Sequence, residues 1–141
     1  MILEEGGLLE GTCQMVCNFK ANGYDWAPLT DSSAVTVADH PSPSTFDFNC
    51  AAYGGSGFYY HLQTSVTDLS IGDHQVDGDM LININGRESE TATGKCAVHV
   101  DSIGTVNGYV TPKGTYSCPE LPVAYGKYEM HGPFEVPLPK Q

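Results

Sequence analysis

Hydrophobic and polar residues alternate along most of this chain, and the clearest alternation runs through residues 58–66. Successive side chains of a β-strand point to opposite faces, so a period of two predicts a strand with one buried face. Residues 58, 60, 62, 64 and 66 are expected to face the core. The opposite face is expected to carry Tyr59, His61, Gln63 and Ser65.

Similar patterns predict further strands, among them residues 13–20, 34–38, 46–50, 80–85, 96–100 and 132–138. Asn85-Gly86 is typical of a tight hairpin turn, and a second turn is expected at residues 112–114. No helical pattern is longer than two turns. About eight or nine short strands separated by turns predict an all-β fold, an antiparallel β-sandwich, with a barrel as the less favoured architecture.

Two segments are expected at sheet edges. The segment near Arg87–Thr93 is polar on both faces, and Pro133 and Pro137 have no amide hydrogen for a ladder of backbone hydrogen bonds.

The length of 141 residues suits one domain, which we place at residues 13–141. Residues 1–12 are expected to be a flexible amino-terminal arm or residues added by cloning. They lack the basic and apolar regions of a signal peptide, so an exported protein would already have lost it. Glu10 stands where a lipid-attachment motif before Cys13 needs a small or apolar residue.

The composition excludes some partners. Six Lys and Arg against 17 Asp and Glu give a net charge of −11. Nucleic acid and anionic membranes are therefore unexpected partners, because binding them depends on basic side chains. No run of 18 apolar residues is present, so no transmembrane segment is expected.

Five cysteines in an acidic, turn-rich β chain favour disulfides and an oxidising compartment. Cys96 and Cys118 lie in well-marked strands and are expected to pair. Cys50 would pair with Cys17 or Cys13, which leaves one thiol that is buried, reactive or used between chains. Cys13 and Cys17 would lie roughly 13 Å apart on one strand, too far for a bond between them.

The second half of the chain carries a characteristic layout of short segments, in Ile84–Gly86, Gly94–Val100, Gly108–Val110, Gly114–Leu121 and Gly132–Val136. This layout, over about residues 80–138, resembles β-sandwich domains of bacterial secreted proteins and lipoproteins of unknown function. The resemblance implies an exported, envelope-associated sandwich with a Cys96–Cys118 bridge. It implies no activity, because such domains share a fold and not a function.

Metal chemistry has one candidate segment, residues 73–79, in which Asp73, Asp77 and Asp79 offer oxygen ligands to calcium. The alternative is a solvated turn between strands. His61 and His99 lie on the polar faces of two predicted strands that could be neighbours. No other cofactor is expected.

No nucleophile elbow, dinucleotide-binding or phosphate-binding motif occurs, so we expect a protein that is not an enzyme.

Aromatic side chains give the most suggestive functional pattern, because they stack on sugars and anchor protein interfaces. The candidate ligand-binding residues are Trp26, Tyr53, Tyr59 and His61. We expect a secreted or cell-surface binding module for a glycan or protein. The alternative is a structural subunit of an extracellular assembly, in which residues 8–19 add as a strand to another copy.

Overall fold

The computed structural model describes residues 10–21, 24–25, 29–31, 35–53, 58–84, 88–123 and 126–140. All regular structure in these residues is β-strand. The strands are β1 (Glu10–Cys13), β2 (Met15–Ala21), β3 (Tyr24–Asp25), β4 (Leu29–Asp31), β5 (Val35–Ser42), β6 (Thr45–Tyr53), β7 (Phe58–Val66), β8 (Gly72–Ile84), β9 (Glu88–Val106), β10 (Tyr109–Val123) and β11 (Gly126–Glu135).

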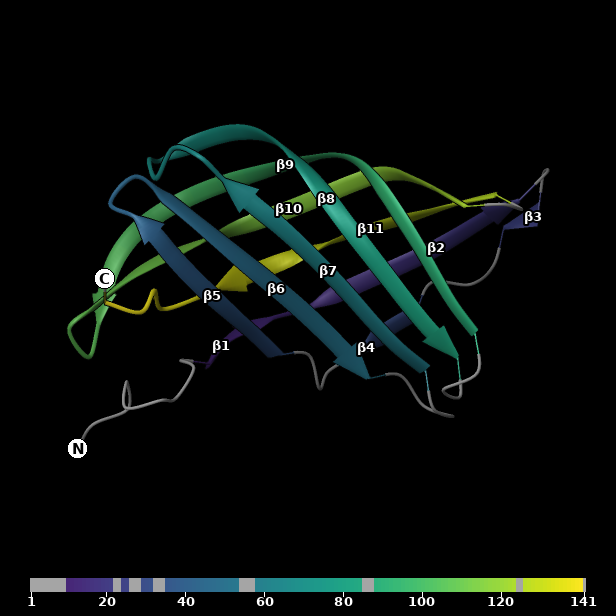
Figure 1. Ribbon diagram of the computed structural model, residues 1–141, viewed down its shortest axis with the longest axis horizontal. Coiled ribbons are helices and arrows are strands. Elements are labelled where there is room, and N and C mark those ends of the chain that lie inside the picture. The colour runs from purple at the N-terminus through teal and green to yellow at the C-terminus, as the bar shows by residue number, and fades with distance from the viewer. Residues whose placement is uncertain are drawn as a thin grey trace.

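The strands form one antiparallel sheet that closes on itself (Figure 1). Pairing runs in order from β5 to β11, and β1 then pairs with both β11 and β5. With β2, which continues β1, nine strands of the described residues make up this ring. The short β3 and β4 pair only with β2 in the described part of the chain. The predicted all-β, antiparallel class and strand number are confirmed.

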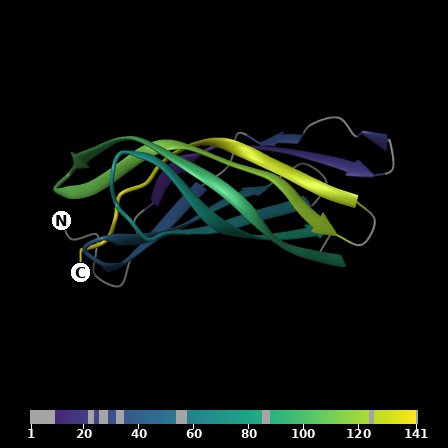
Figure 2. The ribbon, with the colours of Figure 1, turned by 90° about the horizontal axis from the view of Figure 1, so that it is seen from above.

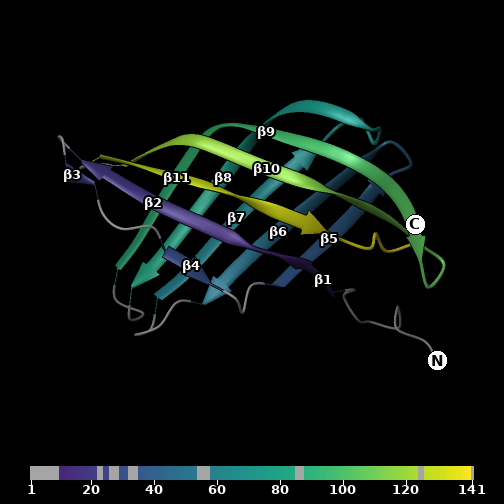
Figure 3. The ribbon, with the colours of Figure 1, turned by 180° about the vertical axis from the view of Figure 1, so that it is seen from behind.

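The ring is flattened into two layers, which Figure 2 shows from above. β5, β6 and β7 lie in one layer, and β10, β11 and β2 lie in the other, as the rear view in Figure 3 also shows. The long strands β8 and β9 pass from one layer to the other. Inward side chains from both layers fill the interior, where the Phe48 and Phe134 rings stack at 4.6 Å.

The ring closes through a pairing in which one residue is a proline. The register is continuous through β1 and β2, from Thr12 opposite Glu135 to Val16 opposite His131, so Gln14 lies opposite Pro133. The Gln14 N–H donates to the Pro133 carbonyl at 3.1 Å, but Pro133 has no N–H that could donate to the Gln14 carbonyl. The buried Tyr116 hydroxyl donates to the Gln14 carbonyl instead, at 2.7 Å.

This arrangement corrects two sequence predictions. Residues 10–12, which we placed in a flexible arm, form most of β1, and residues 1–9 lie outside the described part. The strand that contains Pro133 is not an edge strand, because β11 pairs with β10 on one side and with β1 and β2 on the other. The edge expectation for the return strand is confirmed from Glu88 to Thr93, for which the only ladder among the described strands is with β8.

Turn positions agree less well with the sequence analysis. The predicted turn at residues 112–114 lies inside β10, and the β9–β10 hairpin turns at Asn107-Gly108. Both residues have positive φ, 53° and 85°, as a type I′ turn requires. Asn85-Gly86, where we predicted another turn, lies outside the described residues.

Two disulfides brace the sheet. The predicted Cys96–Cys118 bond joins β9 to β10. Cys50 bonds to Cys13, with Cα atoms 6.2 Å apart, and Cys17 is free and buried. Of the two partners that the sequence left open for Cys50, the structure selects Cys13, so Cys17 is not a disulfide cysteine. The strand register explains why Cys50 bonds to Cys13 rather than to Cys17. Cys13 ends β1, which pairs with β5, and β5 places Thr36 opposite Cys50. Cys17 lies instead on β2, opposite Leu29 of β4.

The part of the chain that the structure describes contains no helix long and apolar enough to cross a bilayer.

Candidate functional site

The outer face of β7 carries the side chains that the alternation predicted. Tyr60, Leu62, Thr64 and Val66 are buried, and the residues between them are at least partly exposed. Pairing with β6 and β8 aligns these outer residues in rows across the sheet. One row joins Ala51, His61, Leu81 and Thr91, and the next joins Asn49, Gln63, Asp79 and Thr93. The residues of these two rows, with Tyr59 and Ser65, are called the outer face below.

The Tyr59 and His61 rings lie next to each other on this face. Their centroids are 6.2 Å apart and their planes differ by 9°. Both side chains are partly exposed. The backbone of Tyr53 lies opposite Tyr59, but its side chain is outside the described part, as is Trp26. Of the four predicted ligand-binding residues, the structure thus places three on adjoining strands.

His61 is half-buried, and burial lowers the pKa of its imidazole below the usual value of 6.5. At neutral pH the ring is therefore uncharged, with one nitrogen that donates a hydrogen bond and one that accepts. It lines a hollow of about 270 Å³ between β7, β8 and β9, together with side chains that include Gln63, Asp79, Thr91 and Thr93.

A second hollow of about 310 Å³ adjoins the first and shares Gln63 and Asp79 with it. It forms where two strands separate, because the β7–β8 pairing ends at Thr64 opposite Gly78, and β8 continues paired with β9. Its other lining residues are Ser65, Thr67, Gln75, Val76 and Asp77. The two hollows together extend along the sheet from His61 to Thr67.

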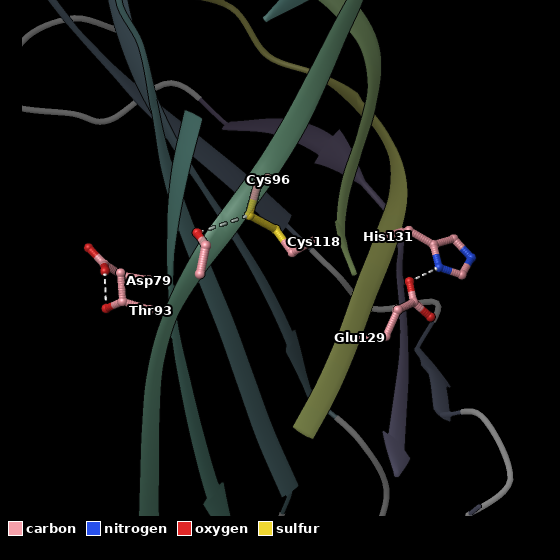
Figure 4. Close-up of a disulfide and its surroundings, with 7 residues drawn as sticks. Asp79, Thr93, Cys96, Cys118, Glu129 and His131 are labelled. Carbon is pink, nitrogen blue, oxygen red and sulfur yellow. Dashed lines mark hydrogen bonds and ion pairs between the residues drawn. A yellow bond between two sulfur atoms is a disulfide. The ribbon is translucent and has the colours of Figure 1, made fainter. Parts of the chain in front are cut away.

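Hydrogen bonds across β8 and β9 fix the carboxylates of this region. The Thr93 hydroxyl donates to Asp79 Oδ1 at 2.8 Å, as Figure 4 shows, and Lys95 Nζ lies 3.0 Å from Asp77 Oδ1. On the core side of the same strands lies the Cys96–Cys118 disulfide. Gly78 leaves room for it, since a Cβ there would collide with Cys96 Sγ. Of the strands that line the hollows, β9 is thus covalently linked to its other neighbour, β10.

The predicted calcium segment has a different structure from either expectation. Residues 73–79 belong to β8 and form neither a turn nor a ligand loop. Each carboxylate has its own partner on β9, namely His99 for Asp73, Lys95 for Asp77 and Thr93 for Asp79. No group of three metal-binding side chains occurs within the residues described. The extended backbone separates the three aspartates, so the structure does not gather them into one site.

His61 and His99, whose predicted strands could have been neighbours, do not meet. His61 aligns with Thr91 of β9 through β8, and His99 lies eight residues further along β9. His99 instead bridges two carboxylates, with Nδ1 2.6 Å from Asp73 and Nε2 3.1 Å from Asp101. The hydrogen bond to Asp73, followed by the charges of both aspartates, raises the pKa of His99 above 6.5.

Sequence reasoning did not identify Gln63, Thr91 and Thr93 as parts of a site. Each is an ordinary polar residue, and only the register of three strands brings them around one hollow.

Comparisons of the chain with protein-family models, with curated proteins and with solved structures find no match.

Proposed function

We propose that this chain is a secreted or cell-surface binding domain that recognises its ligand through the outer face of β7, β8 and β9, and that it is not an enzyme. The observation that carries this proposal is the pair of adjoining hollows, which share Gln63 and Asp79 and lie beside the Tyr59–His61 ring pair. Binding sites combine a concave surface with a few well-placed polar groups on a rigid support.

The support here is sheet rather than loop. The backbone of β7 is paired on both sides, with β6 and β8, from Tyr59 to Thr64. The side chains of the outer face therefore start from fixed positions, and a ligand loses less free energy in ordering them than it would with a mobile loop.

The disulfides support the proposed location. Cys13–Cys50 and Cys96–Cys118 are the kind of bond that persists outside the reducing cytosol. The high negative charge keeps such a domain soluble.

The assembly alternative requires an available amino-terminal strand. Residues 10–13 and 15–19 are already paired within the chain, with β5, β11 and the short strands. Strand addition to another copy by these residues would break those pairings, so we favour the binding function.

The test compares two histidines on different parts of the sheet. His61→Ala removes a side chain from the outer face, whereas His131→Ala removes an exposed side chain of β11 that pairs with Glu129. Wild type and both variants are screened against a glycan array and against a displayed peptide library. The proposal predicts that hits of the wild type are lost with His61→Ala and with Tyr59→Ala, and are retained with His131→Ala. Hits that survive both outer-face substitutions would contradict it.

A further inference from the structure

The two hollows form one continuous depression. They share Gln63 and Asp79, so a ligand that fills one reaches the middle of the other. His61 and Ser65 are four residues apart on an extended strand, which corresponds to about 13 Å. The depression is thus longer than a single sugar ring.

The lining side chains suit a ligand rich in hydroxyl groups. They include the hydroxyls of Ser65, Thr67, Thr91 and Thr93, the amides of Gln63 and Gln75, the carboxylates of Asp77 and Asp79, and the His61 ring. Hydroxyls and amides donate and accept hydrogen bonds, and carboxylates accept them. The hydrogen and the oxygen of a sugar hydroxyl would therefore both find partners. The adjacent Tyr59 and His61 rings offer the apolar contact that the C–H face of a sugar prefers.

The charges around the depression disfavour an anionic ligand. Among the described residues, neither hollow is lined by Lys or Arg, and Asp77 and Asp79 are negative. The neighbouring Lys95 is already paired with Asp77 at 3.0 Å. Phosphate, sulfate and uronic acid groups would therefore meet repulsion rather than pairing.

A protein partner fits less well, because the centre of a protein interface needs large apolar or aromatic anchors. Within the described residues, the exposed large hydrophobic side chains are Ile71, Val106 and Val110. None of them lies on the outer face, and the apolar residues of the two hollows are Val76, Met80, Leu81 and Ala92. Val76, Met80 and Ala92 are buried beneath the depression, so Leu81 and the Tyr59 ring, both partly exposed, are the large apolar groups that the outer face offers to a protein.

We propose that the two hollows together bind a neutral oligosaccharide, with successive sugar units along β7 and β8. Gln63 and Asp79 contact the sugar in the middle, and the Tyr59–His61 pair packs against a sugar at one end. Gln75 contacts a unit at the other end. This inference rests on the proposed function and adds the class of ligand.

The experiment starts from an array of neutral gluco-, manno-, galacto- and xylo-oligosaccharides, with their uronic and sulfated counterparts. Neutral hits are then measured by isothermal titration calorimetry at increasing chain length. Affinity should rise from the monosaccharide to the longer oligosaccharides. Gln63→Ala should weaken binding about tenfold or more, because it removes hydrogen bonds in the shared centre.

Two further variants localise the ligand. Gln75→Ala should weaken binding of the longer oligosaccharides and leave the short ones unchanged, and His131→Ala should change neither. Circular dichroism and thermal unfolding check that each variant is folded.

The contradicting outcomes are distinct. Absence of neutral hits, or a preference for acidic glycans, overturns the inference. A protein ligand that is lost with Tyr59→Ala also overturns it but leaves the proposed function intact. Glycan binding that Gln63→Ala and Tyr59→Ala do not change overturns both.

Discussion

The hydroxyl of Tyr116 should stabilise the closure of the ring. Tyr116→Phe keeps the buried ring, which packs edge-on against Phe48 at 6.2 Å, and removes the donor to the Gln14 carbonyl at 2.7 Å. Pro133, opposite Gln14, cannot replace that donor. This hydrogen bond is partly buried, so its loss should lower the free energy of unfolding by about 0.5–1.5 kcal/mol.

A second substitution tests the cause. Pro133→Ala supplies an amide hydrogen opposite the Gln14 carbonyl, so Tyr116→Phe should cost less when Pro133→Ala is present. Urea unfolding of wild type, both single variants and the double variant, under oxidising conditions, gives the coupling energy between the two sites. A cost for Tyr116→Phe below about 0.3 kcal/mol, or an equal cost in both backgrounds, would refute the reasoning.

Three further predictions concern other positions. Thr64→Val should stabilise the protein by about 1 kcal/mol in urea unfolding, because its buried hydroxyl has no hydrogen-bond partner among the described residues, and a loss of stability would contradict this. Gly78→Ala should destabilise by about 1–3 kcal/mol through a collision with the neighbouring disulfide, whereas Gly104→Ala, with open space around it, should be nearly neutral in the same assay. Because the pKa of His99 is raised, its charged form should stabilise the fold below about pH 6.5, and this contribution should be lost as pH rises through the raised value. Asp73→Asn should flatten this pH dependence of stability. An NMR titration that places the His99 pKa at or below 6.5 would contradict the prediction.

Local alternation was sufficient to predict the strand class and the buried face of β7. The bounds of that strand, Phe58–Val66, agree with the pattern in the sequence. The same alternation continues through residues 73–80, where Asp73, Asp77 and Asp79 point outward and Val76 and Met80 are buried. We interpreted the acidic residues there as a candidate calcium loop or a solvated turn, although the alternation already indicated a strand.

Ring closure depends on contacts that no local pattern contains. Proline in a paired strand normally indicates an edge, because a ladder hydrogen bond is missing. Tyr116, 102 residues from Gln14 in the sequence, supplies the missing donor. The choice of Cys13 rather than Cys17 for Cys50 follows from the same closure, because it places β1 beside β5. Likewise the two hollows depend on the register of β7, β8 and β9, which turn residues and alternation constrain only in part.

The central claim is a sheet closed by β1 and braced by two disulfides in an oxidising compartment. A non-reducing peptide map of protein from its natural source tests it most directly. The account predicts Cys13 linked to Cys50, Cys96 linked to Cys118, and Cys17 as a free thiol that reacts with an alkylating reagent only after unfolding, because burial raises its pKa to about 12. A bond between Cys17 and Cys50 would contradict the closure, and five free thiols would contradict both the bracing and the compartment.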